Sequence, residues 1–282
     1  MNRIAIIVLA HNEERRIARC LASLPVGEDG VAIHVVVNGS TDQTATLARS
    51  FAGITVHDWP ESGKSRSWNR IMLDTPAVQA SEAVVLVDGD AQVTSGSIEA
   101  LAATLVANPT ANAAAGMPRN GRRAEHYRAQ MVQERGLFGD LYALSPAFVE
   151  RWRRSGIRLP EDLIGDDGLV GALAKTDLGP ETEWDDARVV PCAAAGFLCE
   201  PVSAATPASW RLQYRRMINY SVRHFQNRLI SGILQGPGPA ALPRRLASLY
   251  PASLPGLTAR HDPRLWLFDR LALARMARAG GV

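Results

Sequence analysis

The chain has 282 residues, of which 46% are hydrophobic and 21% charged, and its formal net charge at pH 7 is +3. These values are ordinary for a folded protein and exclude a largely disordered chain. Cys20, Cys192 and Cys199 form no Cys-x-x-Cys pair, so we expect neither a disulfide framework nor a zinc cluster, and a reducing cytoplasm fits best. No apolar run is long enough for a membrane span, which predicts a soluble or peripheral protein.

Charge is distributed unevenly along the chain. Residues 210–282 contain twelve arginines, no lysine and only two acids, so this segment carries +10 and the rest of the chain −7. Helical spacing predicts basic amphipathic helices at 242–249 and 264–278, which would either pack on their own domain or lie on the inner face of an anionic membrane. We expect no nucleic-acid partner, because no recognisable binding module accompanies the charge.

Strands and helices alternate through the first 107 residues. Apolar runs at 4–9, 31–37, 54–57 and 83–87 predict strands, each followed by a segment with helical spacing. This alternation implies an α/β fold with a mostly parallel sheet and helices on both faces. Neither a Rossmann glycine fingerprint nor a P-loop follows the first strand, which disfavours a dinucleotide oxidoreductase and a nucleotide triphosphatase.

The second part of the chain is less regular. We expect strands at 112–117, 137–144 and 189–197 and helices at 122–134, 148–154, 169–174 and 210–234. Gly236-Pro237-Gly238-Pro239 breaks the last helix. The predicted organisation is therefore one domain over 1–234, with halves 1–107 and 108–234, and a basic helical extension over 235–282.

The strand expected at 83–87 ends in Asp88-Gly89-Asp90. Carboxylates at the carboxyl end of a parallel strand face the crevice where open α/β sheets bind ligands, and Gly89 lets the backbone bend so that the two acids converge. Two such oxygen donors suit a hard divalent cation, which would in turn hold a phosphate. Taken alone, the same triplet is also compatible with a simple turn.

Five stretches, in order, resemble the family 2 glycosyltransferases. They are residues 6–14, 35–42, 63–69, 88–90 and 165–167. The resemblance spans roughly residues 1–225 and implies a GT-A fold, which is a Rossmann-like α/β architecture. It also implies a nucleotide-sugar donor and a divalent metal, Mn²⁺ or Mg²⁺.

The resemblance assigns roles to four acids. Asp90 and Asp88 would bind the metal that bridges to the donor pyrophosphate, with Asp88 also reaching the ribose or a metal-bound water. Inverting members need a carboxylate that takes the proton of the attacking hydroxyl. Asp167 matches the second acid of the family's acidic pair and is our choice for this base. Asp166 is the close competitor.

The resemblance also implies a donor pocket built from several loops. Its expected residues are Ala10, His11, Asn12, Glu13, Asn38, Gly39, Lys64, Arg66, Asn69 and Asp88, with Arg216 from a Gln-x-x-Arg-Trp-like element in which Met217 replaces the tryptophan. Each charged residue also has a structural alternative: Glu13 could lie in the first turn of a helix, Lys64 in a solvated loop and Arg216 on a helix surface. Val37-Asn38 stands where many members have an acid that contacts the nucleobase of the donor. The identity of the nucleobase is therefore undecided, with UDP slightly favoured.

The sequence therefore predicts a metal-dependent inverting transferase that adds one sugar to a glycan, lipid-linked or small-molecule acceptor. Met217 and the missing membrane span argue against processive polymer synthesis. Two alternatives stay open. A retaining GT-A transferase would share the metal site without needing Asp167, and a catalytically silent member would bind a nucleotide-sugar or an assembly partner without turnover.

Overall fold

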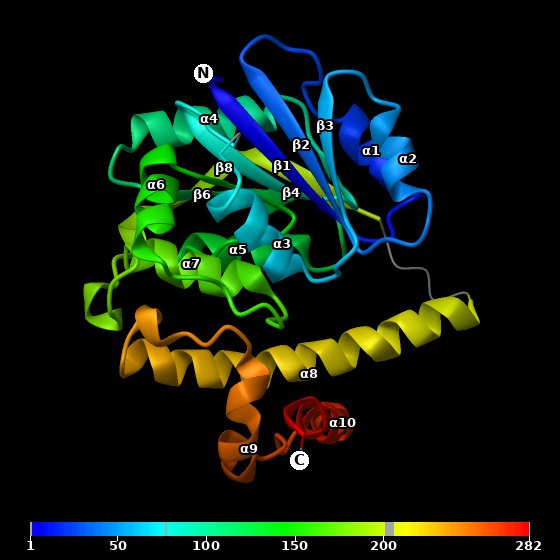
Figure 1. The fold of residues 1–282 in the computed structure, drawn as a ribbon, viewed down its shortest axis with the longest axis vertical. Helices are drawn as coiled ribbons and strands as arrows, with labels where there is room; N and C mark the ends of the chain where they lie inside the picture. Colours follow the sequence, from blue (N-terminus) through cyan, green and yellow to red (C-terminus); the bar gives the residue numbers. More distant parts are fainter. Residues whose placement is uncertain (1, 77, 201–205, 282) are drawn as a thin grey trace.

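The computed structural model describes residues 2–76, 78–200 and 206–281. One eight-stranded sheet forms its frame, with strand order β3-β2-β1-β4-β7-β6-β8-β5. Helices cover the sheet, and a long helix, α8, runs beneath it (Figure 1). The sequence-based expectation of a mostly parallel α/β fold is confirmed, since four of the seven strand pairings are parallel.

The first half of the sheet is wholly parallel. Its strands are β1 (Ile4–Ala10), β2 (Val31–Asn38), β3 (Ile54–Trp59) and β4 (Ala83–Asp88). The intervening and following helices are α1 (Ile17–Ala22), α2 (Thr44–Arg49), α3 (Lys64–Leu73) and α4 (Ser97–Ala107). All seven residues of β1 are buried, as expected for a strand covered on both faces.

The second half mixes directions. Its strands are β5 (Ala91–Val93), β6 (Ala113–Pro118), β7 (Leu141–Leu144) and β8 (Val189–Cys199), and its helices are α5 (Ala124–Glu134), α6 (Pro146–Ser155) and α7 (Asp166–Lys175). Short 3-10 turns occupy Glu181–Glu183 and Asp186–Arg188. Strand β7 is antiparallel to β4 and β6. It is shorter than the strand expected at 137–144, so residues 137–140 form a loop at its start.

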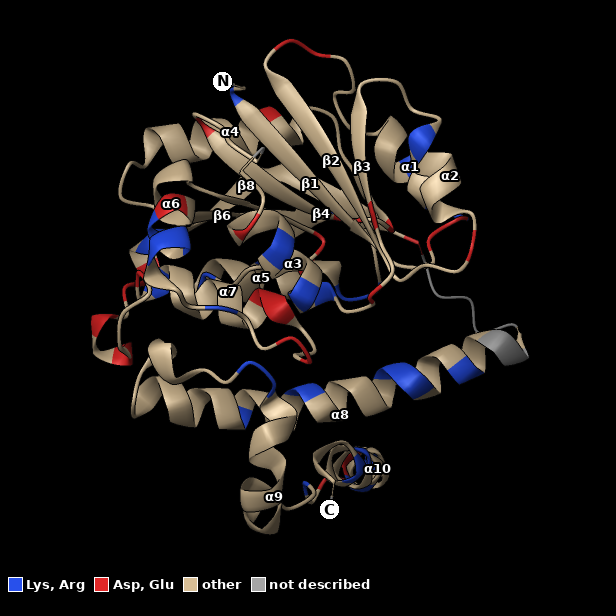
Figure 2. Ribbon diagram, viewed as in Figure 1, with Lys and Arg blue, Asp and Glu red and all other residues tan. Residues whose placement is uncertain are grey.

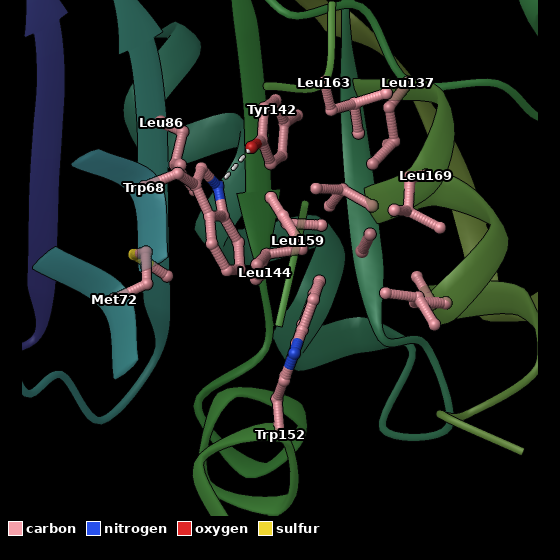
Figure 3. Close-up of a cluster of buried hydrophobic side chains, with 14 of the residues drawn as sticks. Trp68, Met72, Leu86, Leu137, Tyr142, Leu144, Trp152, Leu159, Leu163 and Leu169 are labelled. Atoms are coloured by element: carbon pink, nitrogen blue, oxygen red, sulfur yellow. Dashed lines mark hydrogen bonds between the residues drawn. The ribbon is translucent and has the colours of Figure 1, made fainter. Parts of the chain in front are cut away.

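The sheet separates two apolar cores. Ala5, Ile7 and Leu9 of β1 face one core, and the alternate residues of the strand face the other. In the first core the Trp68 indole Nε1–H donates a 2.9 Å hydrogen bond to the hydroxyl of Tyr142 (Figure 3). This bond ties α3 to β7, so the start of α3 and the loop before β7 are fixed relative to one another.

The C-terminal part begins with α8 (Pro207–Gln235) and ends with α10 (Pro263–Gly280), which crosses beneath it (Figure 1). Between them lie short turns at Pro239–Ala241, Leu246–Leu249, Tyr250–Ser253 (α9) and Leu254–Gly256. The helix expected at 264–278 is confirmed, whereas the amphipathic helix expected at 242–249 is wrong. Pro243 has no N–H to continue a helix, and the N–H groups of Leu246 and Ala247 donate to the Asp162 carboxylate instead.

None of the helices in the described part of the chain is long and apolar enough to cross a membrane.

Candidate active site

The ends of β1 and β4 and the start of β7 meet at one edge of the sheet. In the strand register Leu9 pairs with Asp88, and Val87 pairs with Leu141. Because β7 runs antiparallel to β4, the residue before its start lies beside the end of β4. Asp140 is that residue, and its carbonyl oxygen accepts a 3.2 Å hydrogen bond from the Asp88 N–H.

Three carboxylates converge at this edge. One oxygen each of Asp88, Asp90 and Asp140 lies within 4.8 Å of the other two. Gly89 permits the convergence through close packing, because a Cβ there would come within 2.8 Å of the Ala10 Cβ. Its backbone angle is not in the left-handed region. Asp88 and Asp90 meet as the sequence predicted, and the glycine between them is needed for space.

Asp140 was missed by the sequence analysis. The apolar run after it suggested a strand over 137–144, which would have placed Asp140 inside the strand. The sequence does show an acid next to the start of an apolar run. This acid can be placed beside Asp88 only when the run is known to be a strand antiparallel to β4. The Cys199 thiol lies 3.1 Å from Asp140 Oδ1 and donates to it.

The electrostatics of the cluster favour a bound cation. Burial raises the pKa of Asp88 well above its usual value, and Asp140 adds to the rise while Lys64 opposes it. Burial also raises the pKa of Asp140. Burial alone would lower the pKa of Lys64, but Asp166 and Asp88 outweigh it and hold the pKa high. Lys64 Nζ lies 2.6 Å from Asp88 Oδ1. One ammonium therefore faces several crowded carboxylates, which are hard oxygen donors of the kind divalent cations prefer.

Two further acids open α7 across from this cluster. Asp166 is 2% exposed; its Oδ1 lies 3.5 Å from Lys64 Nζ, and its Oδ2 has no hydrogen-bond partner among the described residues. A Cβ on Gly139 would lie 3.2 Å from Lys64 Nζ and 3.7 Å from both Asp167 Cβ and Asp88 Oδ2. Gly139 therefore lies next to Lys64, Asp88 and Asp167, and a side chain there would contact all three.

Arg223 of α8 reaches Asp167. Its Nη2 donates a 2.9 Å hydrogen bond to Asp167 Oδ1. Gly165 makes room for the guanidinium, because a Cβ there would lie 2.4 Å from Arg223 Nε, and its φ of +80° suits glycine as well. The sequence analysis missed Arg223, because one arginine among many on a helix gives no local signal.

Hydrogen bonds join the loops that follow β1 and β2. His11 Nδ1 lies 2.6 Å from the Asn38 carbonyl oxygen, the Asn38 amide donates to the Ala10 carbonyl, and Asn38 Oδ1 accepts from the Gly63 N–H. Asn38 is 4% exposed, so its side chain holds these segments together. Asn12 makes a similar link, since its Oδ1 accepts from the Thr41 N–H. Gly39, at φ +60°, packs directly on Ser62.

Glu13 belongs to the same edge through Arg16. Arg16 Nη2 lies 2.6 Å from Glu13 Oε2, and Arg16 Nη1 lies 3.5 Å from Asp90 Oδ2. Burial and the neighbouring Asp90 raise the pKa of Glu13 to about 7, against the effect of Arg16. Glu13 precedes α1, so it is not in that helix's first turn. A cavity of about 240 Å³ opens beside Asp90 and is lined by Arg16 and Arg19.

Three predicted donor residues make no hydrogen bond or ion pair with the acids of the edge among the described residues. Arg66 and Asn69 follow Lys64 on α3 at spacings that turn them away from its side of the helix. Arg66 pairs with Glu161 at 3.1 Å, and the buried Asn69 side chain exchanges two hydrogen bonds with the Leu159 backbone. Among the described residues, Arg216 makes no hydrogen bond or ion pair with the acids of the edge.

The acids just before Asp166 have structural partners. Glu161 pairs with Arg66 and with Arg244, and Asp162 accepts from two backbone N–H groups of the C-terminal segment. Gln226 of α8 accepts from the Ile164 N–H and donates to the Asp162 carbonyl. The loop that carries Asp166 and Asp167 is therefore fixed by the C-terminal helices.

Comparison with known proteins places this site in context. The family model described as Glycosyl transferase family 2 matches residues 5–156, which is more than half of the chain. Protein RfbJ of Shigella flexneri is 36% identical over 87 residues, which make up 31% of this chain and 64% of RfbJ. The chain thus spans less than two thirds of that relative.

One solved structure shares the fold, and a second gives a weaker match. Mannosyltransferase PcManGT from Pyrobaculum calidifontis, in complex with GDP-Man and Mn²⁺, superposes with a TM-score of 0.58 at 21% identity over 99% of this chain and 86% of PcManGT. Glucosyl-3-phosphoglycerate synthase from Mycobacterium tuberculosis, in complex with Mn²⁺, UDP and glucosyl-3-phosphoglycerate, gives a TM-score of 0.42 at 23% identity over 52% of this chain and 58% of the synthase.

Proposed function

The chain belongs to glycosyl transferase family 2, and from this premise we propose that it transfers one sugar from a nucleotide-sugar donor to an acceptor hydroxyl. One observation carries the proposal. Asp88, Asp90 and Asp140 converge at the carboxyl edge of the sheet, and Asp88 and Asp167 both lie next to Gly139. Carboxylates that gather at one edge from different elements suit a reaction with a phosphate leaving group to stabilise and a proton to remove.

The three converging carboxylates would hold a divalent cation, Mn²⁺ or Mg²⁺. Such a cation supplies positive charge that stabilises a departing nucleoside diphosphate. Asp88, Asp90 and Asp140 provide oxygen donors, and their crowding leaves negative charge that a single ammonium does not balance. Lys64 would add its own positive charge beside the donor phosphates. The Mn²⁺ in the PcManGT complex agrees with this choice of metal.

We propose Asp167 as the general base. It would take the proton of the acceptor hydroxyl as that oxygen attacks the anomeric carbon and the bond from this carbon to the diphosphate breaks, which inverts the anomeric configuration. Arg223 binds Asp167 Oδ1, which leaves the second oxygen to accept the proton. Asp166 is the alternative base, but its burial and its proximity to Lys64 support a role as that lysine's charge partner.

Arg223 is a positioning residue in this scheme. It contacts the base and comes from a helix that Gln226 fixes to the loop before α7. A carboxylate held by a guanidinium keeps one orientation, and orientation is a large part of the efficiency of an enzymatic base.

The donor base and the acceptor are set by side chains outside the cluster. Asn38 is engaged by backbone groups and does not by itself decide the nucleobase. UDP-sugars are the first donors to assay, and GDP-sugars are the second. The acceptor would be a glycan, a lipid-linked sugar or a small molecule. The basic C-terminal helices support peripheral contact with the cytoplasmic face of a membrane, and Met217 supports addition of a single sugar.

Two alternatives predict different products. A retaining transferase would use the same cation site and yield the opposite anomer without requiring Asp167. A catalytically silent member would bind the nucleotide-sugar without releasing nucleoside diphosphate from it. Incubation with UDP- and GDP-sugars, Mn²⁺ and candidate acceptors, followed by assay of released nucleoside diphosphate and determination of the product anomer, separates the three. An inverted product supports the proposal, and a retained product overturns the role of Asp167.

A further inference from the structure

Aromatic and arginine side chains cover the outer sides of α8 and α10. Trp210 is 68% exposed and Tyr214 48% exposed on α8, and Trp266 and Leu267 are 47% and 52% exposed on α10. Large apolar side chains are seldom exposed together without a partner. We call these four residues, with the exposed arginines Arg211, Arg215, Arg264 and Arg270, the aromatic–arginine surface.

The two helices that carry these residues pack against one another. The Tyr214 and Phe268 rings lie 5.8 Å apart in an edge-on arrangement, and Arg275 Nη1 donates a 2.7 Å hydrogen bond to Asn219 Oδ1. The Arg270 guanidinium lies 5.0 Å from the Trp266 ring. Arginines stacked beside tryptophan are typical of side chains that meet a headgroup layer, where an apolar body is buried and the polar end stays wet.

No exposed acid of α8 or α10 offsets these arginines, apart from one helix cap. Helix α8 contains no acidic residue, as Figure 2 shows by the absence of red along it. Asp269 is fully buried and paired with Arg260 at 2.6 Å. Asp262 caps α10 by accepting from the Arg264 N–H. The surface is therefore apolar in part and strongly positive throughout.

We infer that the aromatic–arginine surface docks on an anionic phospholipid bilayer. A second copy of the chain would bring the same positive charge against it, so self-association through this face is disfavoured. An anionic bilayer offers both complements at once, negative headgroups for the arginines and an interface for the indoles. Since no described helix can cross a membrane, the helices would lie on it.

This inference deepens the membrane contact of the proposed function by naming the surface and its partner. Helix α8 carries both Trp210 and Arg223, which binds the candidate base. Docking through α8 would therefore hold the active site near the membrane plane, where a lipid-linked acceptor would present its hydroxyl.

The test is cosedimentation of the full chain with vesicles of phosphatidylcholine alone and of phosphatidylcholine with phosphatidylglycerol. We expect binding only to the vesicles with phosphatidylglycerol, weakening as salt is added. The double variant Arg264→Glu with Arg270→Glu should reduce partitioning about tenfold or more. The variant Trp266→Ser with Leu267→Ser should reduce it severalfold and more evenly across salt concentrations.

The matched control is Arg122→Glu with Arg123→Glu. This pair is exposed on another part of the molecule and changes the net charge equally, so binding should stay near that of the unaltered chain. Wild-type protein that stays in the supernatant with phosphatidylglycerol vesicles would overturn the inference, and so would an equal loss in the control. The vesicles contain no donor, so vesicle binding tests the surface alone. Mn²⁺-dependent nucleotide binding, measured separately on the same folded variants, tests the donor site of the proposed function.

Discussion

The acidic edge of the sheet and the arginine-rich C-terminal helices place their charges differently. At the edge, Asp88, Asp90 and Asp140 are crowded and partly buried, and the backbone of two neighbouring strands fixes them. On α8 and α10 the arginines are spread over exposed helix surfaces. Crowded, fixed charge suits the binding of one small cation in one geometry, whereas spread, exposed charge suits attraction to an extended surface.

The two regions meet at the loop before α7. Glu161 pairs with Arg244, and Asp167 with Arg223. Through these contacts the C-terminal helices position Asp167, the proposed base. We therefore expect substitutions at the edge to abolish turnover or cation binding, and substitutions in the helices to reduce the rate by a smaller factor.

The largest effect should come from Asp167→Asn. The amide keeps the shape of the side chain but cannot take the acceptor proton, so turnover should fall by about 10²–10⁴-fold while donor binding stays nearly unchanged. Steady-state rates and nucleotide affinity measured on the same preparation check this. Full turnover in the variant would refute Asp167 as the base, and loss confined to Asp166→Asn would assign the role to its neighbour.

Asp140→Asn should weaken the affinity for Mn²⁺ by about tenfold or more, because it removes one of three converging carboxylates. Electron paramagnetic resonance of free Mn²⁺ measures the affinity without any substrate. Asp177→Asn is a control, since that acid pairs with Arg151 away from the edge. Equal Mn²⁺ affinity in Asp140→Asn and the unaltered chain would remove Asp140 from the cation site.

Arg223→Gln should lower kcat about tenfold and leave the donor KM nearly unchanged, because the base keeps its chemistry and loses its orientation. Arg223→Lys should recover part of the rate, because the ammonium can still hold the carboxylate in place. Arg228→Gln, an exposed arginine five residues along the same helix, should behave as the unaltered chain. If both glutamine variants lose rate equally, Arg223 has only a general structural role.

The smallest effect concerns stability. Burial would raise the pKa of Asp269, but its hydrogen bonds with Arg260 and Ser221 lower it to about 2. A lowered folded-state pKa gives stability that is present above the unfolded-state pKa, about 4, and is lost as pH falls toward 2. Asp269→Asn should therefore cost about 2 kcal/mol at neutral pH and progressively less on acidification. Denaturant unfolding at several pH values measures this, and a pH-independent difference would contradict it.

Sequence patterns predicted the features that depend on residues close together in the chain. The apolar runs of β1, β2 and β4 gave their strands, and Asp88-Gly89-Asp90 gave two of the three edge carboxylates. Asp140 required the direction of β7, and Arg223 required the packing of α8 on the loop before α7; both are contacts between residues far apart in sequence. Arg66 and Asn69 stay predictions as donor residues; positions two and five after Lys64 face other sides of α3, where Arg66 pairs with Glu161 and Asn69 with Leu159.

The division of the chain at residue 234 stays a prediction. Leu246, Tyr250 and Met276 of the C-terminal segment belong to the same buried cluster as Trp68, and one sheet runs through both proposed halves.

We propose that the acidic edge binds a nucleoside diphosphate through a divalent cation. Calorimetric titration of UDP and GDP into the full chain, with and without Mn²⁺, measures this binding. We predict that at least one of the two nucleotides binds only when Mn²⁺ is present, and that Asp90→Asn abolishes this binding while the protein stays folded. Binding that is equal without the metal, or unchanged in Asp90→Asn, would show that the edge does not hold the nucleotide through a cation.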